Sequence, residues 1–379
     1  TGDARADFAS SYIIPSAVGS AKIFGNVRCA ASYAKPYGAD ANYGTSQILS
    51  GISTTTANSL DSNELGLTCS YGRDVGPVQA YLLGGGFVQS VDYSETKGTI
   101  VGGTFIDDIA GLQADDTGYG YRLGVGVAKP EIALKASLVY RSAVDHTVTG
   151  LQTLSNTAAT GAVLSAAGLT TAQFQALAIQ AAGGNAAAAA TVNTINGQIS
   201  GLTGNYGVRA EATTPQSIKL ALQTGVAPGT LVFGSVEWTD WSVLQQVVVL
   251  GDGTGTAPGA AAFNGIQTPG APTIDAFFRD GWTVNVGAAR QFTEKFSGLV
   301  SYTWDRGTGV GLSGFSDTHS FGLGVNYKHN DNFSLRAGVS YSHLTEVTYT
   351  ATGIGGVPLT ITNGAGNAIA GGLNMTINF

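Results

Sequence analysis

Apolar and polar residues alternate with a period of two along most of the chain, and this pattern predicts β-strands. The C-terminal segment "NAIAGGLNMTINF" places Ile369, Leu373, Met375, Ile377 and Phe379 on one face, with small or polar residues on the other. The segments "FSLRAGVSYSH" and "HSFGLGVNYKH" repeat the pattern. Each predicted strand therefore has one apolar face and one polar or small face.

Short and long connections alternate between these strands. The short ones are at 25–26, 74–77, 129–131, 227–229, 293–295 and 330–332, and the long ones lie near 45–60, 98–116, 151–203, 249–273, 308–316 and 350–366. A soluble β-sandwich accounts for any single strand of this kind, because its apolar face would point into a shared core. Short turns at one end and long loops at the other instead indicate an antiparallel outer-membrane β-barrel with lipid outside.

The number of predicted strands indicates how many strands the barrel has. Thirteen alternating segments are visible in the sequence, whereas single-chain bacterial barrels have an even number of strands. We therefore expect an all-β protein with a single transmembrane β-barrel over residues 1–379, fourteen-stranded, whose first strand is missing from the sequence. Within it, 151–203 is expected to be a long extracellular loop with short helices, since Thr170 and Gln173 have capping-box spacing.

Composition narrows the classes of function. The chain has 379 residues, of which 55 are glycine and only 11% are charged, and it contains no run of about 20 apolar residues that could cross a bilayer as a helix. A net charge of −7 without a basic stripe argues against a nucleic-acid partner. His146 beside Asp145 forms no dyad, because neighbouring strand residues face opposite sides. We expect no enzyme activity, no catalytic residue, no metal and no cofactor.

One predicted strand contains residues that interrupt it. The stretch "SYAKPYGADANYG" follows the alternating "VRCAA", yet Pro36 has no backbone N–H to donate and Gly38 tolerates backbone angles that leave the ladder. A break in a barrel wall is tolerated in hydrocarbon only where other groups satisfy the freed backbone. The alternative interpretation is a bulge or edge distortion near the upper rim.

This stretch, together with "PEIALKASLVYRSAVDHTVTG", "TTPQSIKLALQTGVAPGTLVFGSVEWTDWS" and the aromatic C-terminus, resembles the FadL family of outer-membrane transporters for long-chain fatty acids and other hydrophobic compounds. The resemblance runs from about residue 26 to the end. It implies a monomeric fourteen-stranded barrel in the outer membrane of a Gram-negative bacterium, surrounded by lipid or detergent. The family's N-terminal hatch has no counterpart here, so hatch-derived binding residues cannot be assigned.

The resemblance also implies where hydrophobic solutes would be captured and released. The family has a kinked strand that opens the wall towards lipid, and here the kink would comprise Pro36, Tyr37, Gly38, Ala39 and Asp40. Loop residues would form a collecting groove for hydrophobic solutes, with the alternative that they only pack the loops together. These groove residues are Phe105, Ile106, Ile109, Leu112, Phe174 and Leu177.

Alternation points several charged residues into the barrel. The candidates for gripping a carboxylate head group, or for organising a polar lumen, are Lys219, Glu237, Arg141 and Lys135, with Arg122, Arg336, Asp145 and Asp305 on the same inner face. Lys219 and Glu237 are expected to be diagonal neighbours across a hairpin. A general diffusion porin for polar solutes and a structural or adhesive barrel remain alternatives to hydrophobic transport.

Cys29 and Cys69 are expected on adjacent strands, on the lipid face and at similar depth. A disulfide between them is chemically permitted in an oxidising compartment. The alternative is two free thiols, which behave as small apolar groups against lipid.

Overall fold

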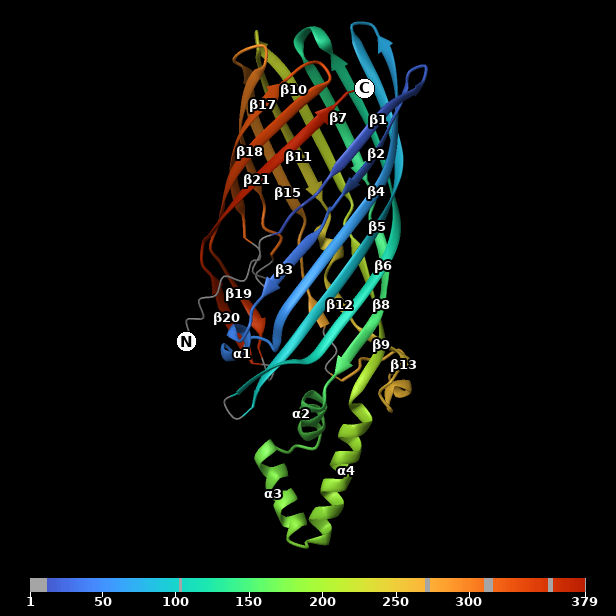
Figure 1. Ribbon diagram of the computed structural model, residues 1–379, viewed down its shortest axis with the longest axis vertical. Helices are drawn as coiled ribbons and strands as arrows, with labels where there is room; N and C mark the ends of the chain where they lie inside the picture. The colour runs from blue at the N-terminus through green and yellow to red at the C-terminus, as the bar shows by residue number, and fades with distance from the viewer. Residues whose placement is uncertain (1–11, 102–103, 270–272, 310–315, 354–356, 379) are drawn as a thin grey trace.

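The computed structural model describes residues 12–101, 104–269, 273–309, 316–353 and 357–378. One large antiparallel sheet curves round the interior of the molecule (Figure 1). Its segments are β1 (Ala17–Phe24), β2 (Val27–Ala34), β3 (Gly38–Asn42), β4 (Thr55–Val75), β5 (Val78–Val101), β6 (Thr104–Lys129), β7 (Leu134–Arg141), β8 (Val144–Leu154), β9 (Gly204–Thr214), β10 (Ser217–Ala227), β11 (Thr230–Thr239), β13 (Leu250–Gly255), β15 (Gly281–Gln291), β16 (Phe296–Asp305), β17 (Thr318–Lys328), β18 (Phe333–Leu344) and β21 (Gly366–Ile377).

Four pairs of these segments continue one another along the wall: β2 with β3, β7 with β8, β9 with β10, and β11 with β13. With each pair joined, the described wall has thirteen strands, which agrees with the alternation in the sequence. Among the described residues, β1 pairs with β2 and β21 pairs with β18, so these two are the edge strands. The fourteenth strand stays a prediction.

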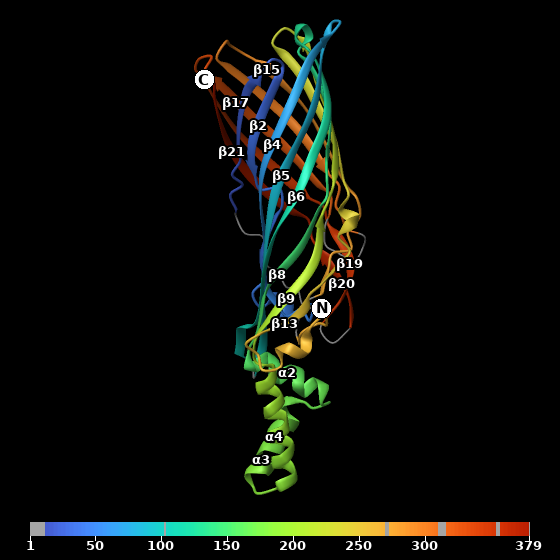
Figure 2. The same ribbon diagram turned by 90° about the vertical axis from the view of Figure 1, so that its right-hand side faces the viewer.

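Most of the remaining elements lie at one end of the wall, which we call the loop end. They include the ribbons β12 (Gln246–Val248) with β14 (Thr273–Asp275) and β19 (Val347–Thr352) with β20 (Pro358–Asn363), and the helices α1 (Ser46–Leu49), α2 (Asn156–Ala166), α3 (Thr171–Ala182) and α4 (Ala186–Leu202). The short 3-10 helices η2 (Trp241–Val243) and η3 (Ala260–Phe263) belong to the same end, and η1 (Pro130–Ile132) lies in a turn at the opposite end, the turn end. Figures 1 and 2 show α2, α3 and α4 projecting away from the wall.

The helix in the long loop begins where the sequence indicates. The side chain of Thr170 accepts a hydrogen bond from the backbone of Gln173, the Gln173 side chain returns to the backbone of Thr170, and the helix ends at Gly183. Within the described residues, no single helix is long and apolar enough to span a membrane, and α2 with α3 reaches that length only as a pair bent by 93°.

One predicted connection is wrong. The sequence predicts a long loop over 98–116, but β5 and β6 continue through this stretch as a paired hairpin, and only residues between Val101 and Thr104 separate them. Glycine, threonine and aspartate make the stretch resemble a loop. These residues are instead compatible with a strand that extends beyond the apolar part of the wall, where no lipid-facing residues are needed.

The outer and inner faces follow the predicted alternation. Outward residues such as Leu65, Leu67, Ile369 and Leu373 are more than half exposed on the outside of the wall. The interior at the loop end is an apolar core formed by the inner faces of β6, β8 and β9 with α2, α4 and the 249–263 connection. Its buried residues are Ala110, Leu112, Leu154, Ala159, Val163, Leu164, Ile195, Ile199, Tyr206, Val208, Ala210, Val249, Ala257 and Ala260.

Candidate functional site

The ladder between β4 and the β2/β3 strand is interrupted at Pro36, and the interruption has the form of the bulge that was the alternative interpretation. Pairing of β2 with β4 ends at Ala34 with Glu64, and pairing of β3 with β4 begins at Gly38 with Asp61. Residues 35–37 therefore face only residues 62–63, so the β2/β3 strand carries one extra residue, as in a β-bulge. Lys35 is held at the break by an ion pair with Asp61, at 2.6 Å.

A side chain of β4 takes the place of the missing ladder bonds at this break. The hydroxyl of Ser62 accepts a hydrogen bond from the backbone N–H of Tyr37 at 2.8 Å and donates one to its carbonyl oxygen at 2.6 Å. Ser62 is fully buried. Both backbone groups of Tyr37 are thereby satisfied, which removes the main energetic objection to an interrupted wall strand.

The break sends the Tyr37 side chain across the interior to another interrupted strand. Its hydroxyl lies 3.4 Å from the carbonyl oxygen of Pro215, between β9 and β10, and 3.2 Å from Nη1 of Arg141, at the end of β7. Its ring meets the ring of Trp241 edge to face, with centroids 5.5 Å apart. Three wall strands, β2/β3, β7/β8 and β9/β10, are thus interrupted close to one another. Tyr37 of the first strand contacts the interruptions in the other two.

A buried carboxylate lies beside Tyr37. Glu64 is 2% exposed and forms ion pairs with Arg122 and Arg141, the latter at 2.7 Å. Both guanidinium groups stack on the ring of Phe87, at 4.7 and 4.5 Å from its centroid. We call Tyr37, Glu64, Phe87, Arg122 and Arg141 the waist of the barrel. The ion pairs and the stacking hold both arginine side chains in fixed positions.

The interior differs in character on the two sides of the waist. Towards the loop end it is the packed apolar core described above. Towards the turn end it contains an inner cavity of about 470 Å³, whose lining mixes polar side chains such as Gln223 and Arg336 with apolar ones such as Leu231, Phe233 and Leu299. The interior therefore changes at the waist from apolar packing to a cavity with polar, charged and apolar side chains.

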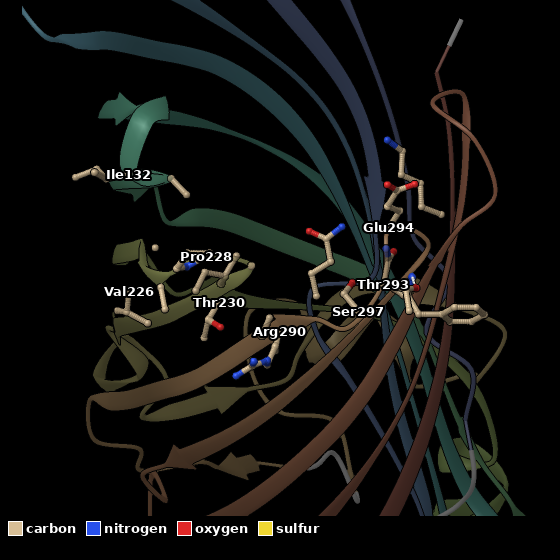
Figure 3. Close-up of a pocket in the computed structure, with 18 of the residues that line it drawn as sticks. Ile132, Val226, Pro228, Thr230, Arg290, Thr293, Glu294 and Ser297 are labelled. Carbon is tan, nitrogen blue, oxygen red and sulfur yellow. Dashed lines mark hydrogen bonds between the residues drawn. The ribbon is translucent and has the colours of Figure 1, made fainter.

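A second cavity, of about 770 Å³, opens among the turns at the turn end (Figure 3). It shares Leu231, Ala289 and Ser297 with the inner cavity, so the two adjoin. Figure 3 shows Arg290 and Glu294 among the side chains that surround it. The mouth of the barrel at this end therefore carries charged side chains among apolar ones such as Ile132 and Val226.

The predicted interior charges do not form one site. Lys219 and Glu237 face each other directly in the ladder, rather than diagonally, and form an ion pair at 2.9 Å. Arg141 belongs to the waist. Lys135 is exposed near the turn end, opposite Gln223.

The alternation predicts that Asp145 points into the barrel, and this prediction is wrong. The structure exposes it on the outer face, where its carboxylate accepts a hydrogen bond from Thr213 at 2.8 Å, and buries the neighbouring His146. The reason is the interruption at residues 142–143. An extra residue there reverses the parity, so Arg141 and His146 both point inward although their numbers differ in parity.

The predicted groove residues lie on two different kinds of element. Ile106 and Leu112 are on strand β6 rather than in a loop, and the side chains of Phe105 and Ile109 lie outside the described residues. Leu112 is 4% exposed within the apolar core, and Phe174 of α3 packs against that core. Leu177 is partly buried on the same helix.

Cys29 and Cys69 are directly opposite each other in the β2–β4 ladder, and the structure joins them by a disulfide. Their Cα atoms are 4.0 Å apart. The bond lies towards the turn end from the break, where it ties β2 to β4 and leaves β3 outside its reach.

Several residues of the waist and its surroundings are not among those that the sequence pattern singles out. Glu64, Phe87 and Gln89 lie on inward positions of β4 and β5, and their alternation with outward Leu65 and Val88 is the available signal. The pattern does not indicate that these residues lie close to Tyr37, which is on a different strand.

Both the sequence and the fold are similar to those of known proteins. A family model described as outer membrane protein transport protein (OMPP1/FadL/TodX) matches residues 1–299. No curated protein sequence matches the chain.

Three solved structures are similar in fold. One is a FadL homologue from Pseudomonas aeruginosa, with a TM-score of 0.70 and 14% identity, covering 96% of this chain and 78% of that one. Another is the monoaromatic hydrocarbon channel CymD, with a TM-score of 0.55 and 10% identity, covering 97% and 83%. The third is the toluene transporter TbuX from Ralstonia pickettii, with a TM-score of 0.52 and 14% identity, covering 94% and 79%. At these identities the likeness concerns the fold alone.

Proposed function

The chain belongs to the OMPP1/FadL/TodX family of outer membrane transport proteins, and from this premise we propose how it moves its solutes. As a member of that family it is an outer-membrane β-barrel of Gram-negative bacteria that transports hydrophobic compounds. The family is one of transporters rather than enzymes.

We propose that the solutes are long-chain fatty acids or similar hydrophobic molecules, taken up passively at the loop end and released sideways at the β2/β3 break. The observation that carries this proposal is the waist. Tyr37 extends from the break across the interior to Pro215 and Arg141, so it obstructs the path along the lumen at the same level at which the wall is interrupted. A hydrophobic molecule that leaves through the wall reaches lipid without passing the ion pairs of the waist or the Arg336-containing cavity on its turn-end side.

A second candidate class of solute is uncharged aromatic hydrocarbons. Both waist arginines are already paired with Glu64, so neither is a free partner for a carboxylate head group. The similar folds of a monoaromatic hydrocarbon channel and a toluene transporter agree with this class. A porin for polar solutes is less compatible with the apolar core that packs the interior at the loop end.

An uptake experiment separates these classes. The chain would be expressed in a Gram-negative host that lacks its own fatty-acid channel, and accumulation of labelled oleate and labelled toluene would be measured. We expect faster accumulation of at least one of them and no swelling of proteoliposomes in arabinose. Swelling in arabinose without faster uptake of either hydrophobic compound would show that the protein is a polar porin.

A further inference from the structure

A longer interruption of the wall lies between β6 and the β7/β8 strand. Pairing ends at Arg122 with Arg141 and resumes at Asp115 with Thr149, so residues 116–121 and 142–148 have no paired positions in this ladder. We call this stretch the β6–β8 slit. Both of its sides are held elsewhere, because β6 pairs with β5 along the whole slit and β8 pairs with β9 from Val144 onward.

Apart from one backbone hydrogen bond, from the N–H of Ser142 to the carbonyl oxygen of Tyr121 at 3.0 Å, side chains close the slit in place of backbone pairing. Gly118 of β6 has no room for a side chain, because an added Cβ would collide with Val144 and would lie 3.0 Å from Cε1 of His146. At the turn-end limit of the slit, the Ser142 hydroxyl accepts a hydrogen bond from the backbone N–H of Tyr121 at 3.0 Å. Val144, His146 and Ser142 thus fill the space between the strands.

His146 connects the two sides of the slit. One ring nitrogen, Nδ1, lies 3.0 Å from the carboxylate of Asp116 on β6, and Nε2 lies 3.2 Å from the amide oxygen of Gln89 on β5. The same amide oxygen accepts a hydrogen bond from the hydroxyl of Thr214 on β9, at 2.8 Å. His146 is 3% exposed and Gln89 is fully buried.

Gln89 also has an unused donor. Its amide nitrogen Nε2 is buried and has no hydrogen-bond partner among the described residues. A buried donor without a partner is destabilising, so an oxygen atom brought to this point would be stabilised by accepting its hydrogen bond. Gln89 faces Glu64 across the ladder, which places this donor beside the waist.

On the outside of the wall, the slit lies at the edge of the band of exposed apolar residues that would face lipid. Tyr119 is 80% exposed on the outside of β6, and Leu123 and Val125 continue the exposed apolar face towards the turn end. Aromatic residues of this kind are enriched where a membrane meets water. The slit therefore separates the buried interior near Gln89 from the interface on the outside of the wall.

We propose that the β6–β8 slit is a second lateral passage, which takes hydrophobic molecules that carry one oxygen atom able to accept a hydrogen bond from Gln89. The proposal rests on the proposed function, since it places a second route in the same transporter. Opening needs a rotation of His146 away from Asp116 and release of the Thr147 N–H from the same carboxylate. Among the described residues, only one backbone hydrogen bond, from the N–H of Ser142 to the carbonyl oxygen of Tyr121, joins the two sides, and it lies at the turn-end limit of the slit. Side-chain rotation is far less costly in a membrane than leaving ladder bonds unsatisfied.

The test maps where a photoreactive solute contacts the protein. The purified chain is reconstituted in phospholipid bilayers, exposed to a long-chain alcohol that carries a diazirine, irradiated and analysed by peptide mass spectrometry. We expect label on 116–121 and 142–148, in addition to label at the β2/β3 break. Label at the break without label in the slit would overturn the second passage. Absence of label from the whole interior would instead contradict the proposed function.

Two variants make the result specific. In a Cys29→Ser/Cys69→Ser background, Asp116→Cys and His146→Cys joined by a short thiol-reactive bridge should lose the label in the slit and keep it at the break. The matched control joins Lys219→Cys to Glu237→Cys, which face each other in an intact ladder, and should lose neither. Retention of slit label in the bridged variant would count against the passage.

The second variant, Gln89→Leu, tests the polar contact. It should lose labelling by the alcohol and keep labelling by a diazirine alkane of equal length. Equal loss of both labels would show that Gln89 has only a structural role and would refute the assigned solute class. Heat-modifiable migration on gels checks that each variant is folded.

Discussion

Ser62 replaces two backbone partners of Tyr37 at once: its hydroxyl lies 2.8 Å from the Tyr37 amide nitrogen and 2.6 Å from its carbonyl oxygen. A strand interrupted by a proline can persist in the wall because a neighbouring side chain completes the hydrogen bonds. The interruption at Pro36 is therefore closed by a side chain, on a strand that is otherwise paired.

The Ser62→Ala substitution should lower the free energy of unfolding by about 1–3 kcal/mol, because it leaves two buried backbone groups without partners. Ser62→Thr, which keeps the hydroxyl, should lose less. The matched control is Ser70→Ala on the same strand and face, where the hydroxyl makes only an exposed hydrogen bond at 3.3 Å. Urea unfolding in liposomes measures all three, and equal stability of the Ser62 and Ser70 alanine variants would contradict the role given to Ser62.

The Glu64→Gln substitution should destabilise the barrel by about 3–5 kcal/mol, because it removes the buried partner of two arginines. Glu237→Gln is the comparison, since its ion pair with Lys219 is partly exposed and should be worth about 1 kcal/mol or less. The same unfolding measurement applies. A similar small effect at both positions would show that Glu64 does not organise the waist.

Deletion of Pro36 should join β2 and β3 into a continuous strand, because residues 35–37 face only residues 62–63. Removal of the extra residue keeps Ala34 and Tyr37 on the inner face. We expect a folded barrel with slower uptake of hydrophobic compounds. Pro36→Ala, which keeps the extra residue, is the control and should retain most of the uptake; unchanged uptake in the deletion variant would exclude release at this break.

The Tyr37→Ala substitution should open the lumen at the waist, because it removes the ring that reaches Pro215, Arg141 and Trp241. Ion conductance across a planar bilayer should rise. Tyr37→Phe keeps the ring and loses only the hydroxyl contacts, so its conductance should stay near that of the parent. Conductance that is unchanged in the alanine variant would place the barrier elsewhere.

The Cys29→Ser/Cys69→Ser double substitution should lower stability by about 2–4 kcal/mol, since the disulfide closes a loop between residues 40 positions apart. Unfolding of the parent should depend on a reductant, and unfolding of the double variant should not. A parent that unfolds equally with and without reductant would show that the bond does not contribute.

Local patterns in the sequence determined much of the architecture. The alternation around Leu373 and Val339 gives the outward faces, and the helix over Thr171–Ala182 follows from its capping residues. Both signals are local, because a period of two and a capping box depend only on residues that are near each other in the chain. The broken strand is equally local, since the missing N–H of Pro36 and the backbone freedom of Gly38 are properties of the residues themselves.

Only the tertiary structure decided which residues meet inside the barrel. The partners of Tyr37 come from positions as distant as Pro215, and Glu64 is paired with arginines on two other strands. An extra residue at 142–143 reversed the face of Asp145, and continuous pairing turned 98–116 from an expected loop into strands. Each of these outcomes depends on register between strands that are remote in sequence, and a shift of one residue exchanges the two faces of a strand.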